Sequence, residues 1–196
     1  MNEPSVRARH LQNALAVADA LPGGQALRAA LPSQVVEDVE RATGFDWLPL
    51  EHDLAIVRTS AEVLPAEEFE RLWRGIVLEG VEGPLLGLLM RTAVRVFGDE
   101  PLGFARWVPK AWAIIFRNAG AWRIDAPEES AVSLRLAGLP PPCRDPLFAR
   151  SVACSLGAVP MIAGRRGGAR VVDVSDGGAA VRFELHWEAA REASGA

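Results

Sequence analysis

The sequence predicts an α+β fold: an N-terminal helical region followed by a four-stranded antiparallel sheet with an inserted helix. Two observations predict it. Apolar residues recur at helical spacing up to about residue 117, whereas apolar and polar residues alternate in the later segments. Such alternation gives each strand one apolar and one wet face, which is typical of an antiparallel sheet with one covered side. The 196 residues suit a single domain, with a helical part over 4–117 and a sheet-plus-helix part over 119–188.

The first helices are predicted from apolar spacing and from the breaks between them. They cover residues 6–21, 33–42 and 50–63, with Ser33 as the expected N-cap of the second. The next helix has the clearest apolar stripe. Its members fall at i, i+3, i+4, i+7, i+8 and i+11, and they are Phe69, Leu72, Trp73, Ile76, Val77 and Gly80.

Two more helices are expected before the sheet. Residues 84–97 are apolar nearly all round, so we expect this helix to be the central one. Arg91 and Arg95 interrupt it four residues apart, on one face, where something acidic should meet them: an internal carboxylate, a partner chain or an acidic ligand head. The helix over 102–116 contains Pro109, which predicts a boundary or a kink.

The sheet is predicted from four alternating segments. Apolar members of one parity are Trp122 and Ile124, then Val132, Leu134 and Leu136, then Val172 and Val174, and finally Val181, Phe183, Leu185 and Trp187. A small-residue apolar segment over 148–163 is the expected inserted helix. Asp176-Gly177-Gly178 is a hairpin signal between the last two strands.

Composition narrows the possible partners and locations. A net charge of −4 argues against nucleic-acid binding. The longest apolar run, near 85–90, is too short to span a bilayer, so no membrane span is expected. The N-terminus has no secretory apolar region and the chain has only 2 cysteines, which favours a cytoplasmic protein with reduced thiols.

No reactive constellation stands out. The three histidines, His10, His52 and His186, have no metal-ligand spacing to one another or to the cysteines, so no metal site is expected. Neither Cys143 nor Cys154 lies in a C-x-x-C or protease-like context. The glycine-rich stretch 164–170 matches neither a dinucleotide fingerprint nor a P-loop. We therefore expect a protein that is not an enzyme.

The candidates for ligand contact are aromatic and basic. The chain has 6 tryptophans and no tyrosine, and tryptophans that line one cavity would suit a flat or long apolar ligand. Structural core is the competing interpretation. The pocket candidates are Trp73, Arg91, Arg95 and Trp112. His52, near a helix start, is the best axial-ligand candidate for a cofactor by elimination.

The sequence resembles an uncharacterised bacterial family that is enriched in myxobacteria. The residues that carry the resemblance, over about 45–188, are Phe69, Trp73-Arg74, Pro84-Leu85-Leu86, Phe97-Gly98, Pro101, Phe116-Arg117-Asn118, Gly120, Gly164, Phe183, Leu185 and Trp187. That family is in turn similar to the ligand-binding fold of haem nitric-oxide sensors, vinyl-reductase-like domains and small subunits of Golgi tethering complexes. The resemblance implies a cavity between helices and sheet for haem, a tetrapyrrole or an acyl chain, or else a helical dimerisation face.

The sequence departs from the haem sensors at their haem-binding signature. Those sensors hold the haem propionates with a tyrosine–serine–arginine pattern. In this chain Ser133 and Arg135 match the serine and the arginine, and the tyrosine has no counterpart. No histidine lies between Leu54 and Phe116, where a proximal ligand would be expected.

The sequence therefore favours a non-enzymatic cytoplasmic adaptor or regulatory domain. We expect it to associate with a protein partner or with itself as a homodimer, to hold at most a small hydrophobic molecule, and to need no cofactor. The alternative is a haem or tetrapyrrole sensor that uses His52. A third hypothesis is an enzyme that uses Cys154 or an Arg/Glu pair.

Overall fold

The structure, a computed structural model, describes residues 3–83, 87, 92, 100–125 and 127–189. The N-terminal helices are α1 (Ala8–Asp19), α2 (Gly24–Ala30), α3 (Ser33–Arg41), α4 (Leu50–Val63) and α5 (Ala66–Glu82). They form where the sequence places apolar stripes, except α2, which was not predicted. The stripe on α5 is confirmed, because Phe69, Leu72, Trp73 and Ile76 are all buried.

The N-terminal region also contains strands that the sequence analysis missed. β1 (Ser5–Arg7), β2 (Trp47–Pro49) and β3 (Phe116–Arg117) form a small antiparallel sheet in the order β2-β1-β3. Residues 5–7 are therefore extended rather than helical. The expected cap is also wrong: Ser33 is the first residue of α3, and Pro32 precedes it without a side-chain cap.

The predicted helix over 102–116 is two helices, α7 (Pro101–Ala105) and α8 (Val108–Ile115). Pro109 lies in the first turn of α8, where its missing N–H costs nothing, so the predicted boundary is confirmed. The predicted helix over 84–97, with Arg91 and Arg95, lies outside the described residues.

The predicted four-stranded antiparallel sheet is confirmed. Its strands are β4 (Ala121–Ile124), β5 (Ala131–Ala137), β6 (Gly167–Ser175) and β7 (Ala180–Trp187), in the order β4-β5-β7-β6. The register aligns residues of one parity across the strands, as in the row Trp122–Leu136–Val181. That parity is buried on β4, β5 and β7, and Arg123, Arg135 and Arg182 lie on the opposite, open face. The prediction is wrong for β6, where Val172 and Val174 are 45% and 54% exposed. β6 is an edge strand whose register with β7 shifts between Val171 and Asp173, so its alternation does not mark a covered face.

The inserted helix is α9 (Pro146–Leu156), which continues after Gly157 into α10 (Ala158–Ile162). A 3-10 turn, η1 (Pro141–Cys143), precedes α9, and a second, η2 (Asp176–Gly178), joins β6 to β7 where the hairpin signal lies. The Asp145 carboxylate accepts a hydrogen bond of 2.9 Å from the Leu147 N–H and so caps α9.

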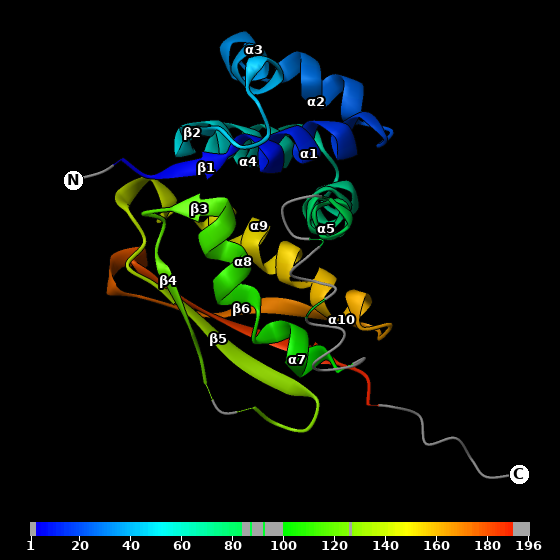
Figure 1. Cartoon of the computed structure of the whole chain (residues 1–196), viewed down its shortest axis with the longest axis vertical. Coiled ribbons are helices and arrows are strands. Elements are labelled where there is room, and N and C mark those ends of the chain that lie inside the picture. Colours follow the sequence, from blue (N-terminus) through cyan, green and yellow to red (C-terminus); the bar gives the residue numbers. More distant parts are fainter. Residues whose placement is uncertain (1–2, 84–86, 88–91, 93–99, 126, 190–196) are drawn as a thin grey trace, which may run out of the picture.

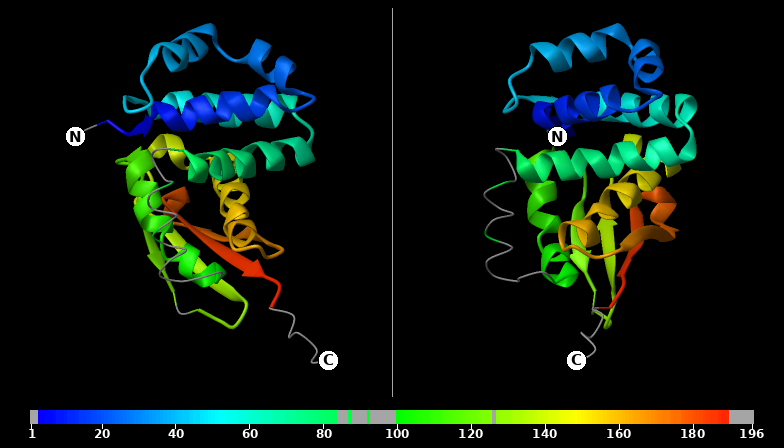
Figure 2. Two further views of the ribbon diagram at one scale, coloured as in Figure 1. Left: turned by 45° about the vertical axis from the view of Figure 1, so that its right-hand side comes forward. Right: turned by 90° about the vertical axis from the view of Figure 1, so that its right-hand side faces the viewer.

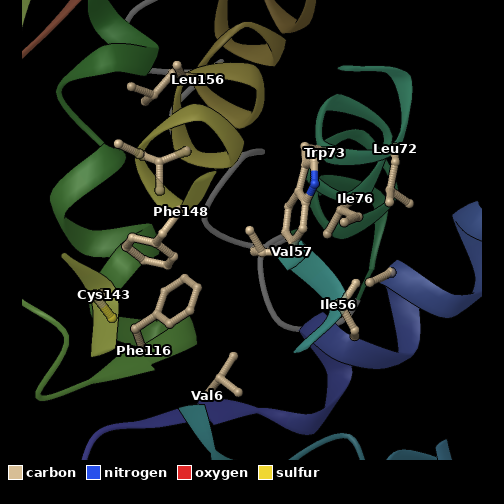
Figure 3. Packing of buried hydrophobic residues seen from close by; sticks show 14 of the residues in the cluster. Val6, Ile56, Val57, Leu72, Trp73, Ile76, Phe116, Cys143, Phe148 and Leu156 are labelled. Atoms are coloured by element: carbon tan, nitrogen blue, oxygen red, sulfur yellow. The ribbon is translucent and has the colours of Figure 1, made fainter. Parts of the chain in front are cut away.

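The elements form two parts with α5 between them (Figures 1 and 2). The helices α1 to α4 lie on one side of α5, and the main sheet with α7 to α10 lies on the other. α5 packs against α1 and against α9. The approach to α1 is close, because a Cβ added at Gly75 would lie 2.8 Å from Val17 Cγ1. Buried side chains from both parts meet along α5 (Figure 3).

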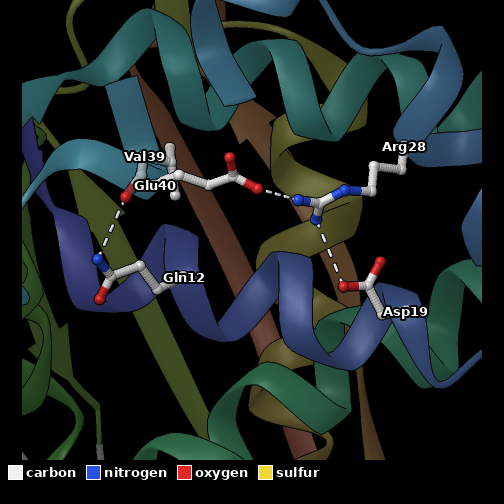
Figure 4. Close-up of polar contacts among 5 residues, drawn as sticks. All are labelled: Gln12, Asp19, Arg28, Val39 and Glu40. Carbon is white, nitrogen blue, oxygen red and sulfur yellow. Dashed lines mark hydrogen bonds and ion pairs between the residues drawn. The ribbon is translucent and has the colours of Figure 1, made fainter. Parts of the chain in front are cut away.

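Polar contacts tie α1 to α2 and α3 (Figure 4). The Gln12 amide donates to the Val39 carbonyl at 3.2 Å, and Arg28 bridges Asp19 and Glu40. These contacts fix the outer helices on α1, whose other side faces α5. Within the described residues, no helix has both the length and the apolar character that crossing a bilayer requires.

Candidate ligand-binding site

A cavity of about 130 Å³ lies between the N-terminal helices and the sheet part of the fold. Its walls are mostly apolar. The largest side chains on the walls are Trp73 from α5, Trp112 from α8, Trp122 from β4, Phe116 from β3 and Phe148 from α9. Figure 3 shows Trp73 on one side, with Phe116 and Phe148 facing it from the other. The cavity is thus bounded by both parts of the fold.

The aromatic side chains of the walls touch one another in series. Trp112 is central: its ring centroid lies 4.1 Å from that of Phe116 and 5.6 Å from that of Trp122, and Phe148 meets it edge-on. His10 contacts Phe116 edge-on at 5.3 Å, and Trp122 contacts Phe183 at 5.4 Å. A continuous chain of rings therefore runs from α1 past the cavity to β7.

A few polar side chains line the cavity beside these rings. Arg9, His10 and Asn13 come from α1, and Asp53 comes from α4. His10 Nε2 lies 3.3 Å from Asp53 Oδ1, and the two side chains are only 10% and 2% exposed. Asp53 occupies a place in the buried stripe of α4, between Leu50 and Leu54. A carboxylate in such a place is costly unless it is paired.

The buried polar atoms that lack a hydrogen bond are concentrated at this cavity. In the described part of the chain there are five such side-chain atoms: His10 Nε2, Asp53 Oδ1 and the indole nitrogens of Trp73, Trp112 and Trp122. All five residues line the cavity. His10 Nε2 and Asp53 Oδ1 face each other, whereas the three indole N–H groups have no acceptor. Because buried donors are normally satisfied, these indoles indicate a site where a further molecule supplies partners.

One wall of the cavity is loosely packed. α8 is the most apolar of the cavity helices in sequence, yet none of its residues is fully buried. It contributes Val108, Ala111, Trp112 and Ile115 to the cavity. Its inner face therefore borders the cavity, and Val108, Trp112 and Ile115 are only partly buried where they pack against the core.

The structure brings two of the predicted pocket residues together and separates the others. Trp73 and Trp112 both line the cavity. His52 does not: it lies on α4 with its Nε2 hydrogen-bonded to Asp38 at 3.0 Å. Arg91 and Arg95 lie outside the described residues. His186 is exposed on the open face of the sheet, as its strand parity predicts.

The sequence analysis missed the polar residues of the cavity. A signal was present for Asp53, which interrupts the apolar stripe of α4 at a position three residues after Leu50. His10 lies beside the buried stripe of α1, one residue before Leu11. Neither position points to the other, because the two residues meet only when α1 packs on α4.

The cysteines are free and poorly suited to nucleophilic chemistry. Burial raises the pKa of Cys143 to about 12, and the nearby carboxylates of Asp53 and Glu51 add to the effect. Burial likewise raises the pKa of Cys154 to about 11. Neither residue lines the cavity.

Comparison with known proteins identifies the fold. No protein-family model and no curated protein matches the chain. Among solved structures, a variant H-NOX protein from K. algicida in the unliganded Fe(II) state matches with a TM-score of 0.64 and 7% identity, over 93% of this chain and 96% of that one.

Two further matches agree with it. An oxygen-binding H-NOX domain related to soluble guanylate cyclases, solved as its oxygen complex, has a TM-score of 0.61 and 9% identity, over 91% of this chain and 93% of its own. A structure from work on haem distortion in the H-NOX family has a TM-score of 0.63 and 10% identity, over 97% of this chain and 100% of its own.

These matches correct one expectation. No cofactor was expected from the sequence, and the likeness to solved structures whose descriptions name haem contradicts that expectation. The error came from treating the missing tyrosine and the missing mid-chain histidine as decisive, whereas the fold and its cavity are kept without them. The chain has the haem-NO-binding fold of the H-NOX domains.

Proposed function

We propose that this chain is a sensor domain whose cavity binds a flat hydrophobic cofactor of the haem or tetrapyrrole class. The observation that carries the proposal is the cavity itself: every described buried side-chain atom without a hydrogen bond belongs to a residue that lines it. The likeness to haem-binding domains supports the class of ligand.

The side chains at the cavity fit such a ligand chemically. Among the described residues no group of three or more potential metal ligands comes together. A haem does not need one, because its porphyrin supplies four nitrogens and a single axial residue is enough. His10 offers an imidazole at the cavity. The tryptophan rings offer flat apolar walls.

The size of the cavity requires that one wall moves. Small-molecule pockets usually measure about 300–1,000 Å³, more than the cavity of about 130 Å³ seen here. α8 is the wall best suited to move, because its core-facing residues, among them Val108 and Ile115, are only partly buried. Segments with few buried contacts open at low free-energy cost. Binding would then replace empty space along the inner face of α8 with ligand contacts.

The ring series gives a route by which occupancy can affect the rest of the domain. A ligand against Trp112 would press on Phe116 and Trp122, which lead to α1 and to the sheet respectively. The positions of both α1 and the main sheet would therefore depend on whether the cavity is filled. A bound haem would supply an iron centre that takes gaseous ligands or electrons.

Hemin titration of the full chain tests the proposal. We expect a Soret band that saturates near one equivalent, together with a higher Tm, because a ligand that binds only the folded state stabilises it. Hemin that adds to an exposed apolar surface instead would leave the Tm unchanged. Absence of both effects would contradict the proposal.

The proposal does not include catalysis by the chain, and it keeps a reducing, cytoplasmic location. The raised pKa values of both thiols argue against a cysteine nucleophile. The free state of Cys143 and Cys154 supports a reducing compartment.

Self-association is a second candidate function, favoured by β6. This strand lies at the edge of the described sheet, where Val172 and Val174 are 45% and 54% exposed. An edge strand offers backbone groups to a further strand, here β6 of a second copy across a two-fold axis. Light scattering tests it: the dimer expected for the wild type should be lost in Val174→Lys and kept in Phe45→Lys. A monomeric wild type would contradict it.

A further inference from the structure

We propose that His10, held by Asp53, is the residue that binds the iron of a haem in the cavity. This inference rests on the proposed function. It differs from the prediction made from the sequence, which assigned that part to His52.

His10 lies at the wall of the cavity. Among the described residues that line the cavity, His10 is the one that carries an imidazole, and none carries a thiol. Its side chain is 10% exposed and its Nε2 faces Asp53, so the nitrogen left for a metal is Nδ1. The ring is held at the cavity wall by its edge-on contact with Phe116. A buried and fixed imidazole at a cavity wall has the properties of an axial ligand.

The Asp53 carboxylate faces the imidazole ring of His10. Histidines that bind metals usually donate their other ring N–H to a carboxylate, which fixes the tautomer and makes the free nitrogen a better ligand. Asp53 Oδ1 lies 3.3 Å from His10 Nε2 and has no other partner. With the proton on Nε2, facing Asp53, the other ring nitrogen keeps its lone pair.

The other two histidines do not combine a place at the cavity with a carboxylate partner. His52 also faces an aspartate, Asp38, but away from the cavity, and its Nε2 is already hydrogen-bonded. His186 is exposed on the outer face of the sheet. The chain has 3 histidines in all, so the assignment can be tested by elimination as well as by direct substitution.

The first experiment keeps His10 and removes the other two. The full-length double variant His52→Gln/His186→Gln is loaded with hemin, and histidine ligation is read by electron paramagnetic resonance and magnetic circular dichroism. We expect the spectra of the wild type. Loss of the histidine signature in this variant would overturn the inference, and the result does not depend on whether a His10 variant folds.

The second experiment replaces His10 by glutamine, which keeps an N–H donor for Asp53. We expect loss of the histidine signature and its return with added imidazole, whereas His52→Gln, the matched control, changes neither. Asp53→Asn should weaken hemin binding by about 10–100-fold, the usual effect of removing such a partner. A His10→Gln spectrum equal to that of the wild type would overturn the inference and leave the proposed function standing. A wild type that takes up no hemin would overturn both.

Discussion

Trp112 meets Trp122 edge-on across the cavity wall, with ring centroids 5.6 Å apart, and neither indole N–H has a hydrogen-bond acceptor. The contact joins α8 to the first strand of the main sheet. Two large side chains with unsatisfied donors would be a poor choice for a purely structural core, because an alanine- or leucine-lined wall would avoid that cost. The pair is suited to a wall that a ligand completes.

A larger side chain in the cavity should increase the stability of the chain and weaken its binding of hemin. Ala111 lines the cavity from α8, and Ala111→Leu should raise the free energy of unfolding by about 0.5–2 kcal/mol, as cavity-filling changes commonly do. The same change should weaken hemin binding, because it occupies the site. Ala113→Leu, on the exposed side of α8, is the matched control. Denaturant unfolding and absorbance titration measure the two effects; unchanged hemin affinity in Ala111→Leu would place the ligand elsewhere.

The His10–Asp53 pair should cost stability rather than provide it. Removing one member of a buried polar pair leaves the other without a partner and typically costs about 1–3 kcal/mol, whereas replacing both by apolar residues of similar shape is often neutral or stabilising. We therefore expect His10→Phe alone to destabilise the chain and His10→Phe/Asp53→Leu to be at least as stable as the wild type. Urea unfolding of the three proteins measures this. A double variant that is as unstable as the single one would show that the pair is structural.

Asp38 should make the stability of the chain depend on acid pH. Its hydrogen bond from His52 lowers the pKa of the Asp38 carboxyl below its ordinary value of 3.8, with Gln34 adding to the effect. The folded state therefore favours the carboxylate, and the stabilisation is complete above pH 3.8 and is lost as the pH falls below it. Asp38→Asn should differ from the wild type above that pH, and the difference should shrink on acidification.

The partner of Asp38 provides the control for that measurement. His52→Gln should lower the Tm of the wild type above pH 3.8 and should have no further effect when Asp38 is already asparagine. Additive losses in the double variant would show that the two side chains act independently.

Both thiols should be unreactive in the folded protein. With pKa values of about 12 for Cys143 and about 11 for Cys154, roughly one thiol in a thousand or fewer is ionised at pH 8. Iodoacetamide at that pH should modify neither residue until denaturant is added, as read by mass spectrometry. Rapid native alkylation of Cys154 would instead revive the hypothesis of a cysteine enzyme.

The sheet and the clearest helix could be predicted because their signals are local. Leu134 and Leu136 alternate with polar neighbours, and Phe69 and Trp73 repeat at helical spacing, so each pattern can be read within one element. The small sheet could not be predicted in this way. Val6 becomes extended only because β1 pairs with Leu48 and Phe116, which are far away along the chain.

Of the residues that line the candidate cavity, only two tryptophans were named as pocket residues from the sequence. Trp73 and Trp112 stand out as large aromatic residues, and both reach the cavity. His10 and Asp53 come from different helices, and the packing of α1 on α4 creates their contact. A search for ligands by sequence spacing selected His52 instead, since spacing cannot show that its Nε2 is occupied by Asp38.

The structure of the full chain after addition of one equivalent of hemin shows whether the cavity is the cofactor site. We expect a porphyrin in the cavity, between α5 and α8, with Trp73 and Trp112 against it and α8 displaced outward. A porphyrin on the outer surface, with the cavity closed and α8 unmoved, would contradict the account.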